Sequence, residues 1–198
     1  MIAIVKYNAG NIQSVMCALN RLGYDAVVTD DVEMIKKADK VIFPGVGEAS
    51  TAMAYLESIN LIDTLKDLKK PFLGICLGMQ LLCERSDEND CRCMGMFDVP
   101  VVEFDKTSGF KIPHVGWNTI YDLKSDLYKD VKENSYCYFV HTYYVPVCDY
   151  TIAKCEYAGV SFSASIKRDN FYATQFHPEK SGSIGETILN NFLKLEDK

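Results

Sequence analysis

The chain has 198 residues, 48% of them hydrophobic and 24% charged, with a formal net charge of −6; this fits one globular domain, placed at residues 1–198. The acidic balance and the lack of a Lys/Arg block argue against nucleic-acid binding, which depends on clustered cations. No run approaches the roughly 18 apolar residues of a membrane span and no signal peptide is recognisable, so we expect a soluble, cytoplasmic protein without membrane contact.

The first half of the chain alternates short apolar runs with helical patterns. Apolar runs predict strands, and apolar residues spaced three or four apart predict helices between them. Strands alternating with helices are typical of parallel βαβ units and a doubly wound sheet. The expected strands are 2–5, 26–28, 41–43 and 72–75, and the expected helices are 12–22, 32–37, 49–58 and 61–68.

Beyond about Gly95 the pattern becomes strand-like, and we expect mixed and antiparallel sheet there. The charged stretch 84–92, which precedes this part, is expected to be a loop. No repeat or long linker divides the chain. The expected strands are 99–104, 135–145, 151–157, 162–166 and 171–175, followed by a last helix over 184–195.

One cysteine sits in a pattern that favours a nucleophile. An apolar strand over 71–75 runs through the Gly-x-Cys-x-Gly segment Gly74–Gly78 into a helical pattern. In such a nucleophile elbow the glycines permit a tight turn from strand to helix. The amino end of a helix also favours a thiolate. Cys76 is therefore a candidate nucleophile, and a buried core cysteine is the alternative.

A second segment offers a base for that nucleophile. The strand-like run 171–176 ends in His177, Pro178 and Glu179. A cysteine nucleophile needs a base, and the base needs a carboxylate to fix its tautomer. Glu179 lies two residues beyond His177, past a rigid proline, and can reach the imidazole. The other two histidines, His114 and His141, have no adjacent carboxylate.

The remaining cysteines give no metal site. Eight cysteines are scattered along the chain without the density of a secreted disulfide scaffold, so reduced thiols are the simpler interpretation. Cys91 and Cys93, with Cys83 upstream, are close in sequence. However, the spacing of a zinc site and an obvious fourth ligand are missing. We therefore expect no metal and no cofactor.

Together the two motifs, about a hundred residues apart, resemble the signature pair of class I (triad) glutamine amidotransferases. The resemblance implies an α/β fold: a single amidotransferase domain with a flavodoxin-like, doubly wound mixed sheet, helices on both faces and an antiparallel extension in the C-terminal half. Further segments resemble the glutaminase subunit of imidazole glycerol phosphate synthase, in the same order and across nearly the whole chain. They are Tyr7–Asn11, Pro44–Gly47, Pro113–Asn118 and Tyr138–Tyr143.

The resemblance also implies roles for single residues. Cys76 would be the nucleophile, His177 the acid and base, and Glu179 its orienting partner. An oxyanion hole would come from backbone N–H groups at Val46, Gly47 and Leu77, which stabilise the charge formed when the glutamine carboxamide is attacked. Taken alone, Pro44–Gly47 also fits an ordinary turn after a strand.

Four residues are candidates for binding the substrate, glutamine. Gln80 lies one helical turn after Cys76 on the same face, where its amide can reach a ligand; a surface glutamine is the alternative. By resemblance, Glu88 and the main chain at Thr142 and Tyr143 hold the glutamine head group. The expected products are glutamate and ammonia, formed through a glutamyl thioester.

The resemblance further implies a partner. Ammonia would pass to a separate (β/α)8 cyclase subunit, which forms imidazole glycerol phosphate and AICAR in histidine biosynthesis, so we expect a heterodimer. For Trp117 a core aromatic residue is the alternative, and for Lys180 a solvated lysine. In the subfamily, the positions that meet the partner match His114, Trp117, Asn118, Tyr138 and Lys180.

Three other interpretations remain at this point. A paralogue that supplies ammonia for surface-glycan or nucleotide-sugar synthesis would share every motif. A cysteine peptidase of the same fold would have a comparable elbow but not the His-Pro-Glu ending. A catalytically dead binding module is disfavoured by the intact Cys76, His177 and Glu179.

Overall fold

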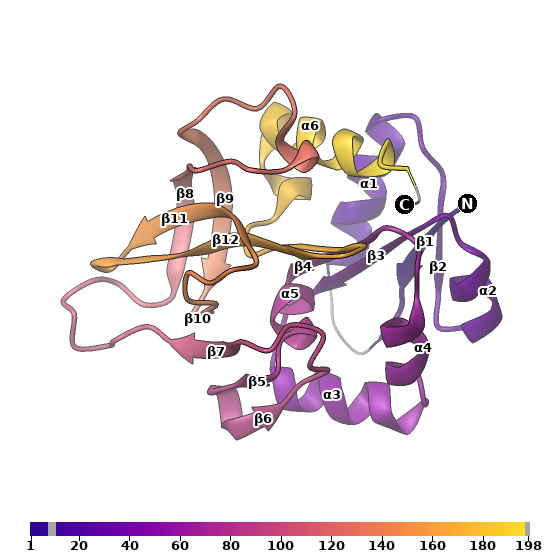
Figure 1. Cartoon of the computed structure of the whole chain (residues 1–198), viewed down its shortest axis with the longest axis horizontal. Helices are drawn as coiled ribbons and strands as arrows, with labels where there is room; N and C mark the ends of the chain where they lie inside the picture. The colour runs from indigo at the N-terminus through magenta and orange to yellow at the C-terminus, as the bar shows by residue number, and fades with distance from the viewer. Residues whose placement is uncertain (8–10, 197–198) are drawn as a thin grey trace.

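The computed structural model describes residues 1–7 and 11–196 (Figure 1), so the Asn8–Gly10 part of the first resembling segment lies outside the described residues. A seven-stranded sheet in the order β11-β12-β13-β4-β3-β1-β2 forms its centre. The pairs from β13 to β2 are parallel, whereas β11, β12 and β13 pair antiparallel. The strands are β1 (Ile2–Val5), β2 (Ala26–Thr29), β3 (Lys40–Gly45), β4 (Phe72–Cys76), β11 (Thr151–Tyr157), β12 (Val160–Arg168) and β13 (Phe171–Thr174).

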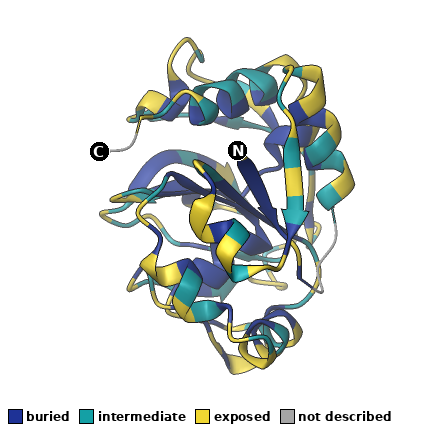
Figure 2. Ribbon diagram, turned by 90° about the vertical axis from the view of Figure 1, so that its right-hand side faces the viewer, coloured by how far each residue is buried: buried dark blue, intermediate teal, exposed yellow. Residues whose placement is uncertain are grey.

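Helices cover both faces of this sheet (Figure 1). Helices α1 and α6 pack on one face, and α2 to α5 pack on the other, so two apolar cores form, one on each side. The central strands are buried on both faces, as Figure 2 shows in dark blue. The helices are α1 (Ile12–Arg21), α2 (Val32–Lys37), α3 (Ala49–Ser58), α4 (Ile62–Asp67), α5 (Leu77–Leu82) and α6 (Gly182–Leu193).

The predicted mixed α/β sheet is confirmed. Continuous apolar runs such as Phe72–Cys76 are what a parallel strand buried on both faces requires. None of the helices described here is long and apolar enough to cross a bilayer.

Two smaller sheets lie beside the central one. The first has the order β10-β7-β5-β6, and the second is the antiparallel pair of β8 and β9. Short 3₁₀ turns connect the larger elements. The bounds are β5 (Arg85–Ser86), β6 (Cys91–Arg92), β7 (Pro100–Glu103), β8 (His114–Ile120), β9 (Ser135–His141), β10 (Tyr143–Tyr144), η1 (Glu88–Asp90), η2 (Asp126–Tyr128) and η3 (Pro178–Lys180).

Two sequence predictions are wrong in this region. The stretch 84–92 is not a plain loop, because Arg85 and Ser86 pair with Arg92 and Cys91, and also with β7. The expected strand 135–145 is broken at Thr142 into β9 and β10, which join different sheets. Strand β8 was not anticipated as a strand.

Candidate active site

The candidate nucleophile lies at the sharp turn between β4 and α5. Strand β4 ends at Cys76 and α5 begins at Leu77, with Cys76 at φ 55° and ψ −108°. A side chain at Gly78 is excluded, since a Cβ there would lie 1.9 Å from the carbonyl oxygen of Phe43. The elbow predicted from the sequence is therefore formed, at the carboxyl edge of the parallel strands where α/β proteins bind ligands.

His177 and Glu179 approach this turn from the neighbouring strand. Strands β13 and β4 run parallel with Thr174 opposite Ile75, so the chain that follows β13 passes beside Cys76. The Nδ1 atom of His177 lies 2.8 Å from Oε1 of Glu179, and both side chains are buried. The carboxylate thereby fixes the orientation of the imidazole.

The surroundings of His177 favour its charged form. Burial lowers the pKa of His177, but its interactions with Cys76 and then with Glu179 more than offset this and raise the pKa above the ordinary 6.5. Within residues 1–7 and 11–196, its Nε2 atom has no hydrogen-bond partner. This nitrogen is therefore available to exchange a proton with the sulfur or with a substrate atom.

Asn11 contacts both His177 and Glu179, although the sequence did not predict it as a site residue. Its Nδ2 atom donates a hydrogen bond to Oε1 of Glu179 and lies 3.5 Å from Nδ1 of His177. Asn11 precedes α1 with φ 78°, a left-handed conformation that asparagine tolerates. Its position at the end of the Tyr7–Asn11 segment was the available indication of a role.

A pocket of about 250 Å³ opens over the cysteine. It contains every residue expected to form the oxyanion hole or to bind substrate, whereas His177 and Glu179 lie outside its lining. Pro113, Val140 and His141 also line it and were not among the expected substrate residues. The expected lining residues are Val46, Gly47, Cys76, Leu77, Gln80, Glu88, Thr142 and Tyr143.

The segment after β3 lies next to the nucleophile. Gly45 is the parallel register partner of Cys76, so Val46 and Gly47 continue directly beside the sulfur-bearing turn. Gly47 has φ 116°, a conformation that side chains strongly disfavour. Backbone N–H groups here and at Leu77 are thus within the same pocket as Cys76.

Gln80 is buried, so a surface glutamine is excluded. Its Nε2 atom donates to the carbonyl oxygen of Tyr143 at 3.0 Å and to Oε1 of Gln175 at 3.1 Å. Gln175 in turn places its own Nε2 atom 3.8 Å from the sulfur of Cys76. The amide nitrogen of Gln80 therefore holds the pocket wall together.

Glu88 brings a carboxylate to the rim of the pocket. Burial raises the pKa of Glu88, and the backbone N–H of Ala49, which donates to its Oε2 atom at 2.7 Å, acts in the opposite direction. The bond to Ala49 joins the 84–92 segment to the start of α3. A cationic ammonium group would find a partner here.

The expected partner-facing residues separate into two groups. Trp117 is 56% exposed, so a core position is excluded, and its ring lies 6.0 Å from that of Tyr138 on β9. Lys180 is also exposed, in η3 directly after Glu179. His114, by contrast, is buried, with Asn118 beside it. Trp117 shares its face of the β8–β9 pair with the exposed Val115 and Tyr136.

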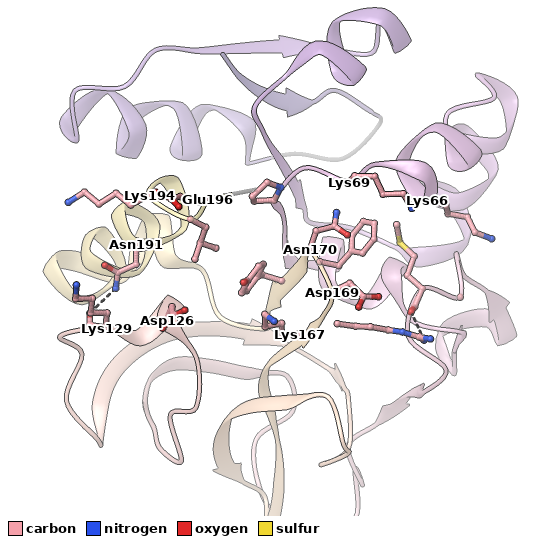
Figure 3. Close-up of a pocket in the computed structure, with 17 residues that line it drawn as sticks. Lys66, Lys69, Asp126, Lys129, Lys167, Asp169, Asn170, Asn191, Lys194 and Glu196 are labelled. Atoms are coloured by element: carbon pink, nitrogen blue, oxygen red, sulfur yellow. Dashed lines mark hydrogen bonds between the residues drawn. The ribbon is translucent and has the colours of Figure 1, made fainter. Parts of the chain in front are cut away.

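A larger cavity of about 1070 Å³ lies elsewhere, at the amino ends of β4 and β13 (Figure 3). Lysines such as Lys66, Lys129 and Lys194 surround it, and none of Cys76, His177 and Glu179 lines it. Cavity size alone would select the wrong place, because the chemistry requires a nucleophile and a base. The smaller pocket, which Cys76 lines, is therefore the candidate active site.

Known proteins resemble the chain over nearly its whole length. Residues 4–195 match the family model described as glutamine amidotransferase class-I. The chain is 55% identical to the imidazole glycerol phosphate synthase subunit HisH of Bacteroides fragilis, covering 98% of this chain and 99% of that protein. It is 46% identical to the subunit of the same name from Shewanella loihica, covering 97% and 89%.

Solved structures share the fold. The structure of PurLQS from Thermotoga maritima has a TM-score of 0.71 at 15% identity, covering 97% of this chain and 96% of that one. The glutaminase domain of Trypanosoma brucei CTPS with bound acivicin has a TM-score of 0.65 at 15% identity, covering 100% and 94%. At these identities the likeness concerns the fold alone.

Proposed function

The chain belongs to the class I glutamine amidotransferases, and we propose that it is the glutaminase subunit of an imidazole glycerol phosphate synthase. Its nucleophile is Cys76, its acid and base is His177, and Glu179 orients the imidazole. The observation that carries the proposal is a cysteine at a nucleophile elbow, inside a pocket, beside a buried His–Glu pair. Relatives at 44–55% identity, all named as subunits of this synthase, favour it over a glycan-pathway paralogue or a cysteine peptidase.

The reaction proceeds in two halves. The Cys76 thiolate attacks the carboxamide carbon of glutamine, and His177 gives a proton to the departing nitrogen, which leaves as ammonia. Water then attacks the glutamyl thioester while His177 accepts its proton. The sulfur leaves as a thiolate, which releases glutamate and restores the starting thiolate–imidazolium pair. Each tetrahedral intermediate carries an oxyanion that N–H groups at Gly47 and Leu77 stabilise.

The pocket also matches the zwitterionic head of glutamine. The Glu88 carboxylate is a partner for the α-ammonium group, and backbone groups at Thr142 and Tyr143 bind the α-carboxylate. Both parts line the same pocket as Cys76. The side chain of glutamine then points its carboxamide at the sulfur.

As a synthase subunit, the chain works with a partner subunit. We propose that the partner is a (β/α)8 cyclase, which consumes the ammonia to form imidazole glycerol phosphate and AICAR in histidine biosynthesis. The exposed face with Trp117, together with Tyr138 and Lys180, supports this contact, since exposed aromatic residues are enriched in interfaces. Lys180 directly follows Glu179, so a partner subunit that binds Lys180 would act close to the catalytic triad.

The decisive experiment measures glutamate release by the purified chain mixed with its cognate cyclase. Cys76→Ala should abolish glutamine hydrolysis and leave synthesis from added ammonia unchanged, because the nucleophile serves only to liberate ammonia. Normal turnover by Cys76→Ala would refute the assignment of the nucleophile.

The same assay tests control by the partner. We expect slow hydrolysis by the chain alone and activation of roughly two to three orders of magnitude with the cyclase and its ligand, the effect of one oxyanion donor. Gly45 and Gly47 flank Val46 and permit backbone angles that other residues resist, which allows such a reorientation. Trp117→Ala should weaken activation, and full activity of the chain alone would contradict this control.

A further inference from the structure

Two buried histidines that the reaction does not use lie side by side near the pocket. His114 on β8 and His141 on β9 are register partners, and the Nδ1 atom of His114 lies 2.9 Å from Nε2 of His141. The chain of contacts continues at both ends. Nδ1 of His141 lies 2.8 Å from the carbonyl oxygen of Tyr143, and Nδ2 of Asn118 lies 3.3 Å from Nε2 of His114.

The carbonyl end sets the direction of these hydrogen bonds. The oxygen of Tyr143 only accepts, so the Nδ1 atom of His141 carries a proton. Burial, followed by the proximity of His114, lowers the pKa of His141 to about 3, which leaves its Nε2 atom unprotonated. His114 must then donate from Nδ1. Because burial lowers the pKa of His114 to about 4, its Nε2 atom in turn accepts from Asn118.

The other end independently gives the same direction. The Oδ1 atom of Asn118 accepts the backbone N–H of Thr119 at 2.8 Å, and its Nδ2 atom donates to the carbonyl oxygen of Glu156 at 2.9 Å. These two backbone partners fix the orientation of the amide. The amide nitrogen therefore faces His114, as the direction deduced from Tyr143 requires.

The chain of bonds ends in the wall of the substrate pocket. The carbonyl oxygen of Tyr143 also accepts from Gln80, and His141, Thr142 and Tyr143 all line the pocket. The His141 ring thus bridges across Thr142, where β9 ends and β10 begins. The predicted strand 135–145 is broken at this point, and the hydrogen bond from the His141 imidazole stabilises the backbone conformation of the break.

We propose that His114 and His141 are positioning residues, a neutral relay of hydrogen bonds running from Asn118 to the Tyr143 carbonyl that fixes the glutamine-binding wall at Thr142 and Tyr143. The inference rests on the proposed glutaminase function. The relay attaches this wall to β8, the strand whose outer face carries Trp117, so the shape of the pocket depends on the position of that strand.

Two substitutions of His114 can separate the effect of its stacked ring from the effect of its hydrogen bonds. The ring stacks on Tyr157, with centroids 3.9 Å apart, and on Phe139 at 4.9 Å. His114→Phe retains an aromatic ring but loses the donor. His114→Asn places an amide nitrogen near the original Nδ1 position but loses the stacking.

The kinetic test uses both variants of the full chain in complex with the cognate cyclase. His114→Phe should raise the KM for glutamine roughly fivefold to tenfold, the effect of one hydrogen bond, with little change in kcat. His114→Asn should keep KM near the wild-type value and lower the Tm instead. The relay is refuted if KM rises in His114→Asn, which lacks the ring, and not in His114→Phe, which lacks the donor. It is also refuted if KM changes in neither variant.

A second measurement needs no variant and no glutamine. The chain has three histidines, so ¹⁵N NMR of the imidazoles at pH 7 can resolve each ring. We expect two neutral rings that are protonated on Nδ1. The third ring, that of His177, should be in its charged form at pH 7, because its pKa is raised. A proton on Nε2 of either His114 or His141 would refute the relay. A wild-type complex that releases no glutamate would instead refute the proposed function.

Discussion

The buried histidines occupy two regions whose chemistry is opposite. His177, His114 and His141 are all at most 6% exposed, and burial lowers the pKa of each. At His177 the interactions with Cys76 and Glu179 reverse this effect and raise its pKa. His114 and His141 have no carboxylate or thiol partner of this kind, and the charge of His177 further lowers the pKa of His141, so their pKa values fall to about 4 and about 3. The neighbours of a buried imidazole, rather than its burial, decide whether it transfers protons or holds structure.

The largest effect should come from removing the proton-transferring histidine. His177→Ala is expected to lower glutamine hydrolysis by about 10³-fold, since a positioned acid and base contributes this much. Glutamate release by the complex measures the loss, and synthesis from added ammonia serves as the control for folding. A variant that retains glutaminase activity within tenfold of wild type would erase the distinction between the two regions.

Removing the carboxylate should sharpen the distinction with a smaller loss. Glu179→Gln is expected to lower turnover roughly a hundredfold, less than His177→Ala, because an orienting group contributes less than the acid and base itself. Without the carboxylate, the pKa of His177 should shift downward, which a pH–rate profile detects. Equal and complete loss in the two variants would show that Glu179 also maintains the fold.

The neutral pair predicts a pH dependence of stability. The unfolded chain binds a proton at each histidine near pH 6.5, whereas folded His114 binds one only near pH 4. Between these values the unfolded state carries more protons, so the unfolding free energy falls as the pH decreases. For His114 alone, the loss between pH 7 and pH 5 is about 2 kcal/mol.

Urea unfolding of wild type and His114→Asn at both pH values measures this difference. The carboxylates titrate in both proteins, so their contribution cancels in the comparison. His114→Asn should lose about 2 kcal/mol less than wild type on acidification. An identical loss in the two proteins would mean that His114 is already protonated in the folded state at pH 5.

The sequence predicted what depends on local patterns. Apolar runs and helical spacing located α2 and α3 with the bounds observed, because each element is buried along one regular face. The elbow was recognised because its glycines and Cys76 are adjacent in the chain. The His177–Glu179 pair was recognised for the same reason.

What the sequence missed depends on contacts between distant segments. Strand β8 contains Gly116, which weakens a strand, and its alternating apolar residues Val115 and Trp117 face outward, so the strand depends on its pairing with β9. The relay joins residues 114, 118, 141 and 143. These residues lie on segments far apart in the sequence, so no local pattern indicates that they are hydrogen-bonded to one another. Likewise, the hairpin in 84–92 is stabilised by β7, which follows later in the chain.

Asn11 allows the comparison between the His177 region and the His114–His141 pair to be tested by a change near the triad. It contacts Glu179 and His177 but does not line the substrate pocket. Its φ of 78° calls for Asn11→Gly rather than alanine, because glycine keeps that backbone conformation while removing the amide. Asn60→Gly is the matched control, since Asn60 is an exposed asparagine at φ 53°.

Asn11→Gly should lower kcat roughly tenfold, because the carboxylate that orients His177 loses a charge-assisted hydrogen bond. The KM for glutamine should remain near wild type, since the pocket wall is untouched, and Asn60→Gly should change neither constant. This pattern is the reverse of the one expected for His114→Phe, which affects KM and leaves kcat. Steady-state glutamate release by the three complexes separates the two regions: one orients the proton-transferring imidazole and the other shapes the binding wall. A rise in KM caused by Asn11→Gly would show that the triad and the wall are one coupled unit.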